Sequence, residues 1–166
     1  LNKNMRIVID TSGLLSLAAG NILELATQFF DFIIPARVKQ ELDGISKNND
    51  FEANLAKNIL SYINDKIKII DAYKISQQGE LGCAYLANEL DDVEFLITDD
   101  TKILKKLEKI SKKEVNFSVL IVYTLYLSGK ISKEHGWRVI ERMSVKRNWK
   151  DNVIFKQARV NIISSL

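Results

Sequence analysis

The chain of 166 residues has very little cysteine, histidine or proline, with one residue of each type. A single Cys excludes an internal disulfide framework and suits a reducing cytoplasm. One Cys and one His also cannot supply the four ligands of a zinc knuckle. No apolar run approaches the roughly 18–20 residues that span a bilayer, and residues 1–5 lack the apolar core of a signal peptide. We therefore expect a cytoplasmic protein with no membrane partner.

The composition is that of an ordinary globular domain, with 46% hydrophobic and 27% charged residues. The length predicts one domain, residues 1–166, made of a core at about 6–130 and a basic helical extension at 131–166. The extension carries eight Lys and Arg against three Asp and Glu, whereas the rest of the chain carries sixteen against eighteen. This asymmetry favours a polyanionic partner, and a solvated helix face explains it about equally well.

Two stretches share one design, a buried strand that ends in acid and is followed by a helix. In the first, Ile7, Val8 and Ile9 precede Asp10, and Thr11 and Ser12 supply turn chemistry. In the second, residues 94–98 precede the pair Asp99 and Asp100, and a helical pattern follows over 101–110. Ligands of open parallel sheets bind outside the carboxyl ends of the strands. The two strand ends would form one acidic site if the strands are neighbours.

The remaining periodicities alternate between strand and helix, which predicts an α/β fold around a parallel sheet of four or five strands. After Pro35, a helix carries Val38 and Leu42 on one face with Glu41 at the edge of that stripe. Glu80 falls in the first turn of a helix rich in small residues. Further strands are expected at 32–34, 67–70 and 115–117, and further helices at 14–19, 22–30, 51–63, 119–127, 132–143 and 151–163.

Each acid also has a purely structural interpretation. Asp10 is suited to cap the following helix, Glu41 to be a solvated helical residue, and Glu80 to favour the positive end of its helix. Either Asp99 or Asp100 is suited to cap the helix at 101–110.

As a set, these motifs resemble the PIN domain, a family of metal-dependent ribonucleases, and in particular its VapC-like branch. The resemblance extends over roughly residues 6–130, and the motifs that carry it lie at 7–12, 33–42, 79–90 and 96–100. It implies a three-layer α/β/α fold and cleavage of single-stranded RNA by a metal-dependent endoribonuclease. It also suggests the toxin of a toxin–antitoxin pair, with an antitoxin protein as partner and a homodimer as the assembly.

Carried over by position, the resemblance implies catalysis and metal binding by Asp10, Glu41, Glu80 and Asp99, with Asp100 as a further ligand. Clustered carboxylates repel one another, and a cation relieves the repulsion. Oxygen ligands favour Mg²⁺ or Mn²⁺, which orient a water and lower its pKa. Candidate contacts to the substrate are Ser12, Arg37, Lys102, Lys146, Arg147 and Lys150.

Two other functions fit the same sequence less well. A PIN-like module that binds RNA or protein without cleavage would need none of the acids, yet all of them are present. A phosphoacceptor receiver domain also places acids at strand ends. A receiver, however, has an acid pair after its first strand, whereas here the first strand ends in Asp10 alone and the third in Asp71.

Overall fold

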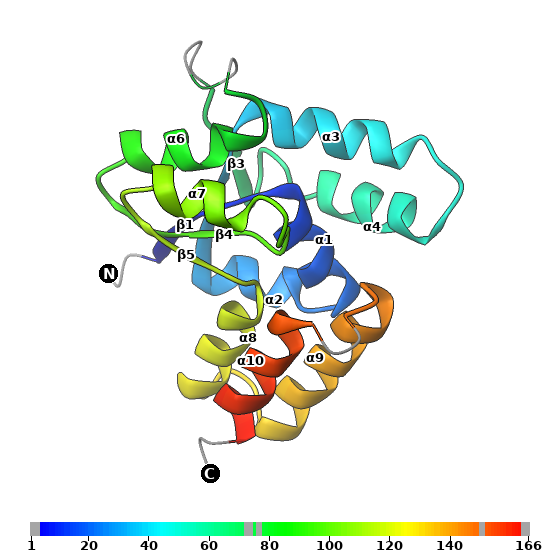
Figure 1. The fold of residues 1–166 in the computed structure, drawn as a ribbon. Helices are drawn as coiled ribbons and strands as arrows, with labels where there is room; N and C mark the ends of the chain where they lie inside the picture. Colours follow the sequence, from blue (N-terminus) through cyan, green and yellow to red (C-terminus); the bar gives the residue numbers. More distant parts are fainter. Residues whose placement is uncertain (1–3, 72–74, 76–77, 150–151, 164–166) are drawn as a thin grey trace.

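A computed structural model describes residues 4–71, 75, 78–149 and 152–163, with side chains as far as Arg159. Its five strands form one parallel sheet in the order β3-β2-β1-β4-β5 (Figure 1). The sheet confirms the predicted α/β class and its strand number. The strands are β1 (Met5–Ile9), β2 (Phe30–Ile34), β3 (Ile67–Ile69), β4 (Val93–Ile97) and β5 (Glu114–Asn116).

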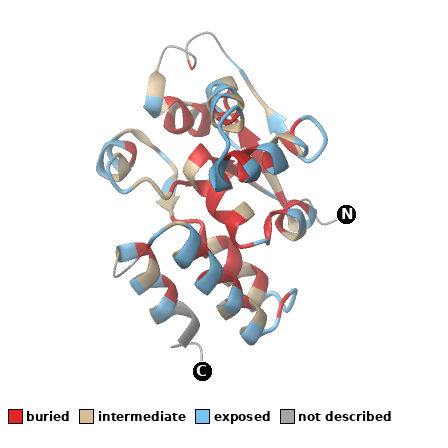
Figure 2. Ribbon diagram, turned by 90° about the vertical axis from the view of Figure 1, so that its right-hand side faces the viewer, coloured by how far each residue is buried: buried red, intermediate tan, exposed pale blue. Residues whose placement is uncertain are grey.

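Helices on both faces of this sheet complete three layers (Figure 1). The helix α6 packs against β1 and β4, while α2 and α3 pack against β2. Because both faces are covered, Ile7, Val8 and Ile9 of the central strand are completely buried, and the buried residues in Figure 2 follow the sheet and the helices next to it. The helices are α1 (Thr11–Ala19), α2 (Leu23–Phe29), α3 (Ala36–Ser46), α4 (Phe51–Leu60), α6 (Gly82–Glu89), α7 (Leu104–Ile110), α8 (Val119–Leu127), α9 (Lys133–Lys146) and α10 (Val153–Ile163), with a 3-10 turn η1 (Gly79–Leu81).

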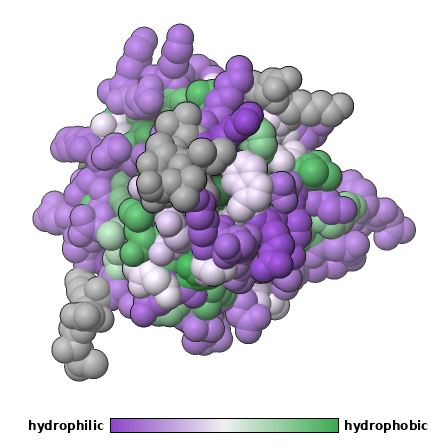
Figure 3. Space-filling view, turned by 90° about the horizontal axis from the view of Figure 1, so that it is seen from below, coloured by the Kyte–Doolittle hydropathy of each residue, from purple (hydrophilic) through white to green (hydrophobic). Residues whose placement is uncertain are grey.

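The C-terminal helices form a layer that continues from α1, below the sheet in Figure 1. The helix α9 contacts α1 and α8, and α10 contacts α8 and α9. Trp149, in the connection between α9 and α10, and Ile154, in the first turn of α10, are buried. Figure 3 views the molecule from this end, where hydrophilic side chains cover most of the visible described surface and apolar ones form small separate patches. Within the described ranges, no helix is long and apolar enough to cross a membrane.

The strand order creates a topological switch point at the centre of the sheet. From β1 the chain builds β2 and β3 on one side, then returns to place β4 and β5 on the other. The backbone N–H of Asp10 donates to the carbonyl of Ile97 at 3.0 Å, which joins the carboxyl ends of β1 and β4. Ligands of such sheets bind at this point, and the two predicted acidic strand ends are therefore neighbours.

Most predicted boundaries shift by one to three residues in the structure; the helix expected over 51–63, for example, ends at Leu60. The helix expected over 22–30 ends at Phe29, because Phe30 already pairs with Met5 of β1. Glu80 lies in η1, just before α6, rather than in the first turn of that helix. Over 101–110, the chain first makes a turn, and α7 begins only at Leu104.

Candidate active site

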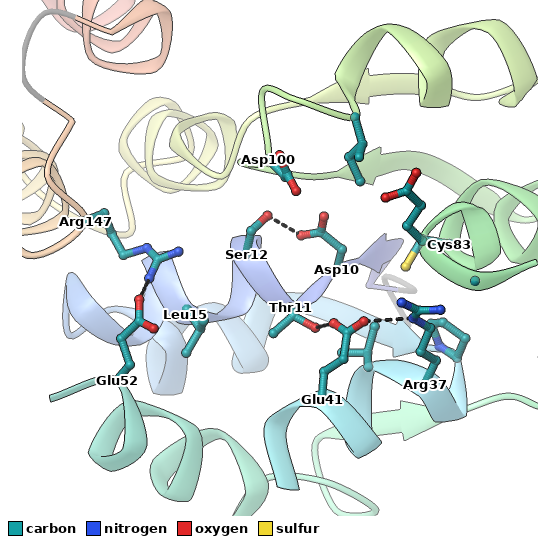
Figure 4. Close-up of a pocket in the computed structure, with 15 residues that line it drawn as sticks. Asp10, Thr11, Ser12, Leu15, Arg37, Glu41, Glu52, Cys83, Asp100 and Arg147 are labelled. Carbon is teal, nitrogen blue, oxygen red and sulfur yellow. Dashed lines mark hydrogen bonds and ion pairs between the residues drawn. The ribbon is translucent and has the colours of Figure 1, made fainter. Parts of the chain in front are cut away.

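A cavity of about 230 Å³ lies at the carboxyl end of the central strand (Figure 4). It brings together residues from β1–α1, α3, α4, η1, the turn after β4 and the end of α9. Five of the lining side chains are carboxylates, Asp10, Glu41, Glu52, Glu80 and Asp100, and two are guanidinium groups, Arg37 and Arg147. The remaining lining residues are Thr11, Ser12, Leu15, Pro35, Val38, Gly79, Cys83 and Ile103.

Asp10 is held at the centre of this cavity by hydrogen bonds to both carboxylate oxygens. Oδ1 accepts from the backbone N–H of Gly13 at 2.9 Å and from the Ser12 hydroxyl at 2.6 Å, and Oδ2 accepts from the Thr98 hydroxyl. Asp10 therefore does cap α1, as its structural interpretation predicted, while it also lines the cavity. Burial raises the pKa of Asp10 to about 6, despite the opposing effect of these bonds.

Glu41 reaches the cavity from α3, whose apolar face carries the buried residues Val38 and Leu42. One carboxylate oxygen accepts from the Thr11 hydroxyl at 2.5 Å, and the other lies 2.8 Å from Nε of Arg37. Arg37 is one helical turn before Glu41, which is the spacing at which such pairs form. Glu41 is therefore not a free, solvated helical residue.

Glu80 lines the cavity from the turn η1. Gly79, just before it, has φ of +58°, a conformation that glycine adopts without strain. The Glu80 carboxylate lies 3.1 Å from Nζ of Lys106 on α7. Both side chains are about half exposed or more, so this pair contributes little to stability.

The two acids after β4 have different environments. Asp100 lines the cavity, and its Oδ1 accepts from the backbone N–H of Lys102 at 2.9 Å. Asp99 is not among the lining residues: its carboxylate accepts from the backbone N–H of Ser118 at 2.8 Å and from the Ser118 hydroxyl at 2.5 Å. Ser118 is the N-cap residue of α8, but its hydroxyl bonds to Asp99 and makes no capping hydrogen bond to the helix. Burial raises the pKa of Asp99, while the bonds from Ser118 lower it.

An ion pair between Arg147 and Glu52 also lines the cavity. Arg147, directly after α9, places Nη1 2.5 Å from Oε1 of Glu52 in the first turn of α4. Figure 4 shows this pair on one side of Asp10 and the pair of Glu41 with Arg37 on the other. The basic extension therefore contributes a cation to the same cavity as the acids.

The structure brings some of the other predicted contact residues to the cavity and leaves others away from it. Ser12, Arg37 and Arg147 line it. Lys102 is exposed and touches Asp100 only through its backbone N–H. The ammonium group of Lys146 lies 4.8 Å from the centre of the Phe51 ring, and Lys150 lies outside the described residues.

Sequence reasoning missed Glu52, Thr98, Lys106 and Ser118. Glu52 follows an ordinary helix cap, Asp50, and nothing in its local pattern distinguishes it from a solvated residue. Thr98 had a recognisable signal, because a hydroxyl that directly precedes an acid pair at a strand end is positioned to bond to the neighbouring strand end. Lys106 and Ser118 become partners of the acids only through the packing of α7 and α8.

The donor chemistry of the cavity suits a hard divalent cation, because its acidic ligands are all oxygen donors. These oxygen ligands do not form a complete coordination sphere. Within the described part of the chain, no three Asp, Glu, His or Cys side chains converge closely enough to hold a metal ion. Arg37 and Lys106 instead neutralise Glu41 and Glu80 individually.

Comparison with protein families gives one match over nearly the whole chain. The family model DUF3368, described as a PIN domain, matches residues 6–162. A comparison with curated proteins finds no significant match. The match extends beyond the core expected to carry the resemblance and includes α9 and most of α10. The chain belongs to the PIN domain family, whose fold is of the nuclease type.

Proposed function

We propose that this protein is a metal-dependent endoribonuclease that cleaves single-stranded RNA. One observation carries the proposal: carboxylates from four separate segments, Asp10, Glu41, Glu80 and Asp100, line one cavity at the switch point of a PIN-domain sheet. Gathering four acids around one cavity is costly for a purely structural role, because like charges repel and the burial of Asp10 disfavours its ionisation.

These four residues would hold Mg²⁺ or Mn²⁺. When bound, such an ion orients a water, lowers its pKa and stabilises charge that develops on the phosphate. We assign Asp100, rather than Asp99, to the ligand set, because Ser118 already donates twice to the Asp99 carboxylate. Asp99 then positions the turn in which Asp100 lies, and its backbone N–H donates to the Ser12 hydroxyl oxygen at 2.8 Å.

The residues around the acids prepare the site. The hydroxyls of Ser12 and Thr98 and the backbone N–H of Gly13 fix the orientation of Asp10. Arg37 and Lys106 serve as counter-charges for Glu41 and Glu80 until a cation takes over that role. Released from the carboxylates, both side chains are free to interact with RNA phosphates.

The test is cleavage of a labelled single-stranded RNA by protein purified away from contaminating nucleases, in Mg²⁺, in Mn²⁺ and in EDTA. Glu41→Gln should lower activity about 100-fold or more, since even changes to residues that only orient metal ligands cost about 10- to 100-fold. Asp43→Asn is the matched control, because Asp43 lies on the same helix and pairs with Lys39 at 2.7 Å away from the cavity. Equal cleavage in EDTA, or equal losses in both variants, would contradict the proposal.

A second comparison tests the choice between the two acids after β4. Asp100→Asn should abolish metal-dependent cleavage while leaving the melting temperature of the metal-free protein nearly unchanged. Asp99→Asn should lower the melting temperature, because it disturbs the bonds from Ser118. If instead Asp99→Asn abolishes metal binding at an unchanged melting temperature, Asp99 is the ligand.

A non-catalytic binding module is the second candidate function. The pairing of Glu41 with Arg37 and of Glu80 with Lys106 favours it, because these pairs already neutralise two of the acids. Titration of the protein with Mn²⁺ in a calorimeter separates the two candidates. Binding that disappears in Asp10→Asn supports the nuclease, whereas RNA binding without any Mn²⁺ binding supports the module.

The assignment as a toxin with an antitoxin partner, and the homodimer, remain hypotheses that rest on the family resemblance. Expression of the active protein alone should arrest growth of a bacterial host if it is a toxin, whereas the Glu41→Gln variant should not. Light scattering gives the oligomeric state of the purified chain. Normal growth together with RNA cleavage in vitro would favour RNA processing or turnover instead.

A further inference from the structure

Arg147 is the least exposed cation of the acidic cavity. Its side chain is 16% exposed, against 44% for Arg37. Nη1 is paired with Glu52, but Nε is buried and has no hydrogen-bond partner among the described residues. A buried donor left without an acceptor is costly. A ligand that enters the adjacent cavity would supply the acceptor that Nε lacks.

The position of Arg147 matches the needs of an anionic substrate. A phosphodiester that approaches Asp10, Glu41 and Asp100 meets carboxylates, which repel it. Arg37 is held by Glu41 on its own helix, whereas Arg147 enters from the opposite side of Asp10 (Figure 4).

We infer that Arg147 binds an RNA phosphate in this cavity, and that Glu52 holds Arg147 in place and competes with the phosphate for it. Guanidinium groups bind phosphate through paired N–H donors, so the free Nε has a use once the substrate arrives. Glu52 is 51% exposed and can turn into solvent, whereas Arg147 stays enclosed. This inference rests on the proposed function, because it identifies how the same cavity tolerates a polyanion.

If Glu52 and the phosphate compete for Arg147, replacing Arg147 and replacing Glu52 should change RNA affinity in opposite directions. If the pair were only a structural link between α4 and the end of α9, Arg147→Gln and Glu52→Gln would have the same effect. In our account, Arg147→Gln weakens RNA binding about tenfold or more, since a hydrogen bond to a charged group is lost. Glu52→Gln strengthens RNA binding, because it removes a negative charge and frees the guanidinium.

The chain offers a closely matched control in Arg6. Its side chain is 21% exposed and pairs with Asp92 at 2.6 Å, so Arg6→Gln also removes one positive charge and breaks an ion pair. Arg6 lies near the start of β1, whereas Asp10 follows the end of that strand, a separation of about 13 Å at the rise of a strand. RNA binding should be nearly unchanged in this control.

The experiment measures the binding of a fluorescent, unstructured oligoribonucleotide in EDTA, as a function of salt. Arg147→Gln should also flatten the slope of log K against log salt by about 0.7, the value for one phosphate contact on a single strand. Arg147→Lys should retain part of the affinity that Arg147→Gln loses, because lysine keeps the positive charge but lacks the paired N–H donors of the guanidinium group. In Mn²⁺, Arg147→Gln should raise the KM for cleavage more than it lowers kcat.

Several results would overturn the inference. These are equal weakening by Arg147→Gln and Glu52→Gln, an effect of Arg147→Gln no larger than that of Arg6→Gln, or no RNA binding by the wild-type protein. If Arg147→Gln does not fold, the sign of the Glu52→Gln effect decides. RNA binding that depends on Arg147, without any metal-dependent cleavage, would refute the proposed nuclease and leave this inference standing.

Discussion

Replacing Asp10 with asparagine should make the metal-free protein gain stability relative to wild type as the pH rises. The carboxyl of Asp10 is half-buried at the end of β1, and burial raises its pKa from 3.8 to about 6. A difference of about two pKa units corresponds to about 3 kcal/mol, at 1.36 kcal/mol for each unit. This is the free energy that the native state loses when Asp10 ionises without a cation.

The sign of the pH dependence follows from proton linkage. Between pH 3.8 and about 6, Asp10 holds its proton in the native state and has lost it in the unfolded state. The native state therefore binds more protons, and stability falls as pH rises through this window. Above about pH 6 the loss is complete. An asparagine side chain does not titrate, so the Asp10→Asn variant escapes this loss.

The assay is urea denaturation in EDTA across this pH range, for wild type and Asp10→Asn. Any change in hydrogen bonding to Thr98 adds a constant offset, so the informative quantity is how the difference in unfolding free energy varies with pH. That difference should move in favour of the variant by up to about 3 kcal/mol between acidic and alkaline pH. Asp65→Asn, which removes one exposed carboxylate in the turn before β3, controls for the loss of a charge. A difference that is constant with pH, or that moves in favour of wild type, would refute the reasoning.

Three further predictions follow from the same region. Mn²⁺ at 100 times its Kd should stabilise wild type by about 2.7 kcal/mol and leave the melting temperature of an Asp10→Asn/Asp100→Asn double variant unchanged. Equal shifts of the melting temperature in the two proteins would contradict the ligand assignment. Ser118→Ala should cost about 1–3 kcal/mol in urea denaturation, because the carboxylate of Asp99 loses its hydroxyl partner; a variant as stable as wild type would refute this role. Gly13→Ala should cost about 1–3 kcal/mol, because an added Cβ would lie 2.8 Å from the side chain of Ile97 on β4 and 2.9 Å from that of Ile9 on β1. An unchanged melting temperature would show that these two side chains move aside at no cost.

The sequence by itself determined the order of strands and helices and the places where acids follow strands. Runs such as Ile7 to Ile9 are typical of a strand covered on both faces, and the structure buries all three residues. The spacing of Val38 and Leu42 likewise predicts which face of α3 is buried. These are local signals, because periodicity and turn chemistry act over a few residues.

The candidate site was predictable to the extent that it lies at strand ends and helix starts. Asp10 and Asp100 line one cavity because the order β3-β2-β1-β4-β5 makes β1 and β4 neighbours, and α3 after β2 and η1 before α6 bring Glu41 and Glu80 to it. The family resemblance assigned both Asp99 and Asp100 to the metal site and gave only Asp99 a catalytic role. The local pattern does not separate the two acids, since both follow the same strand. The packing of α8, which brings Ser118 against Asp99, separates their environments.

Only the tertiary structure decided which cations accompany the acids. Glu52 and Arg147 are 95 residues apart in the chain, and they meet because α9 packs beside α1, which in turn contacts α4. Lys106 finds Glu80 in the same way, through the placement of α7 next to α6. A charge on a helix surface carries no local signal of its partner, because the partner is selected by how whole helices pack and not by spacing along the chain.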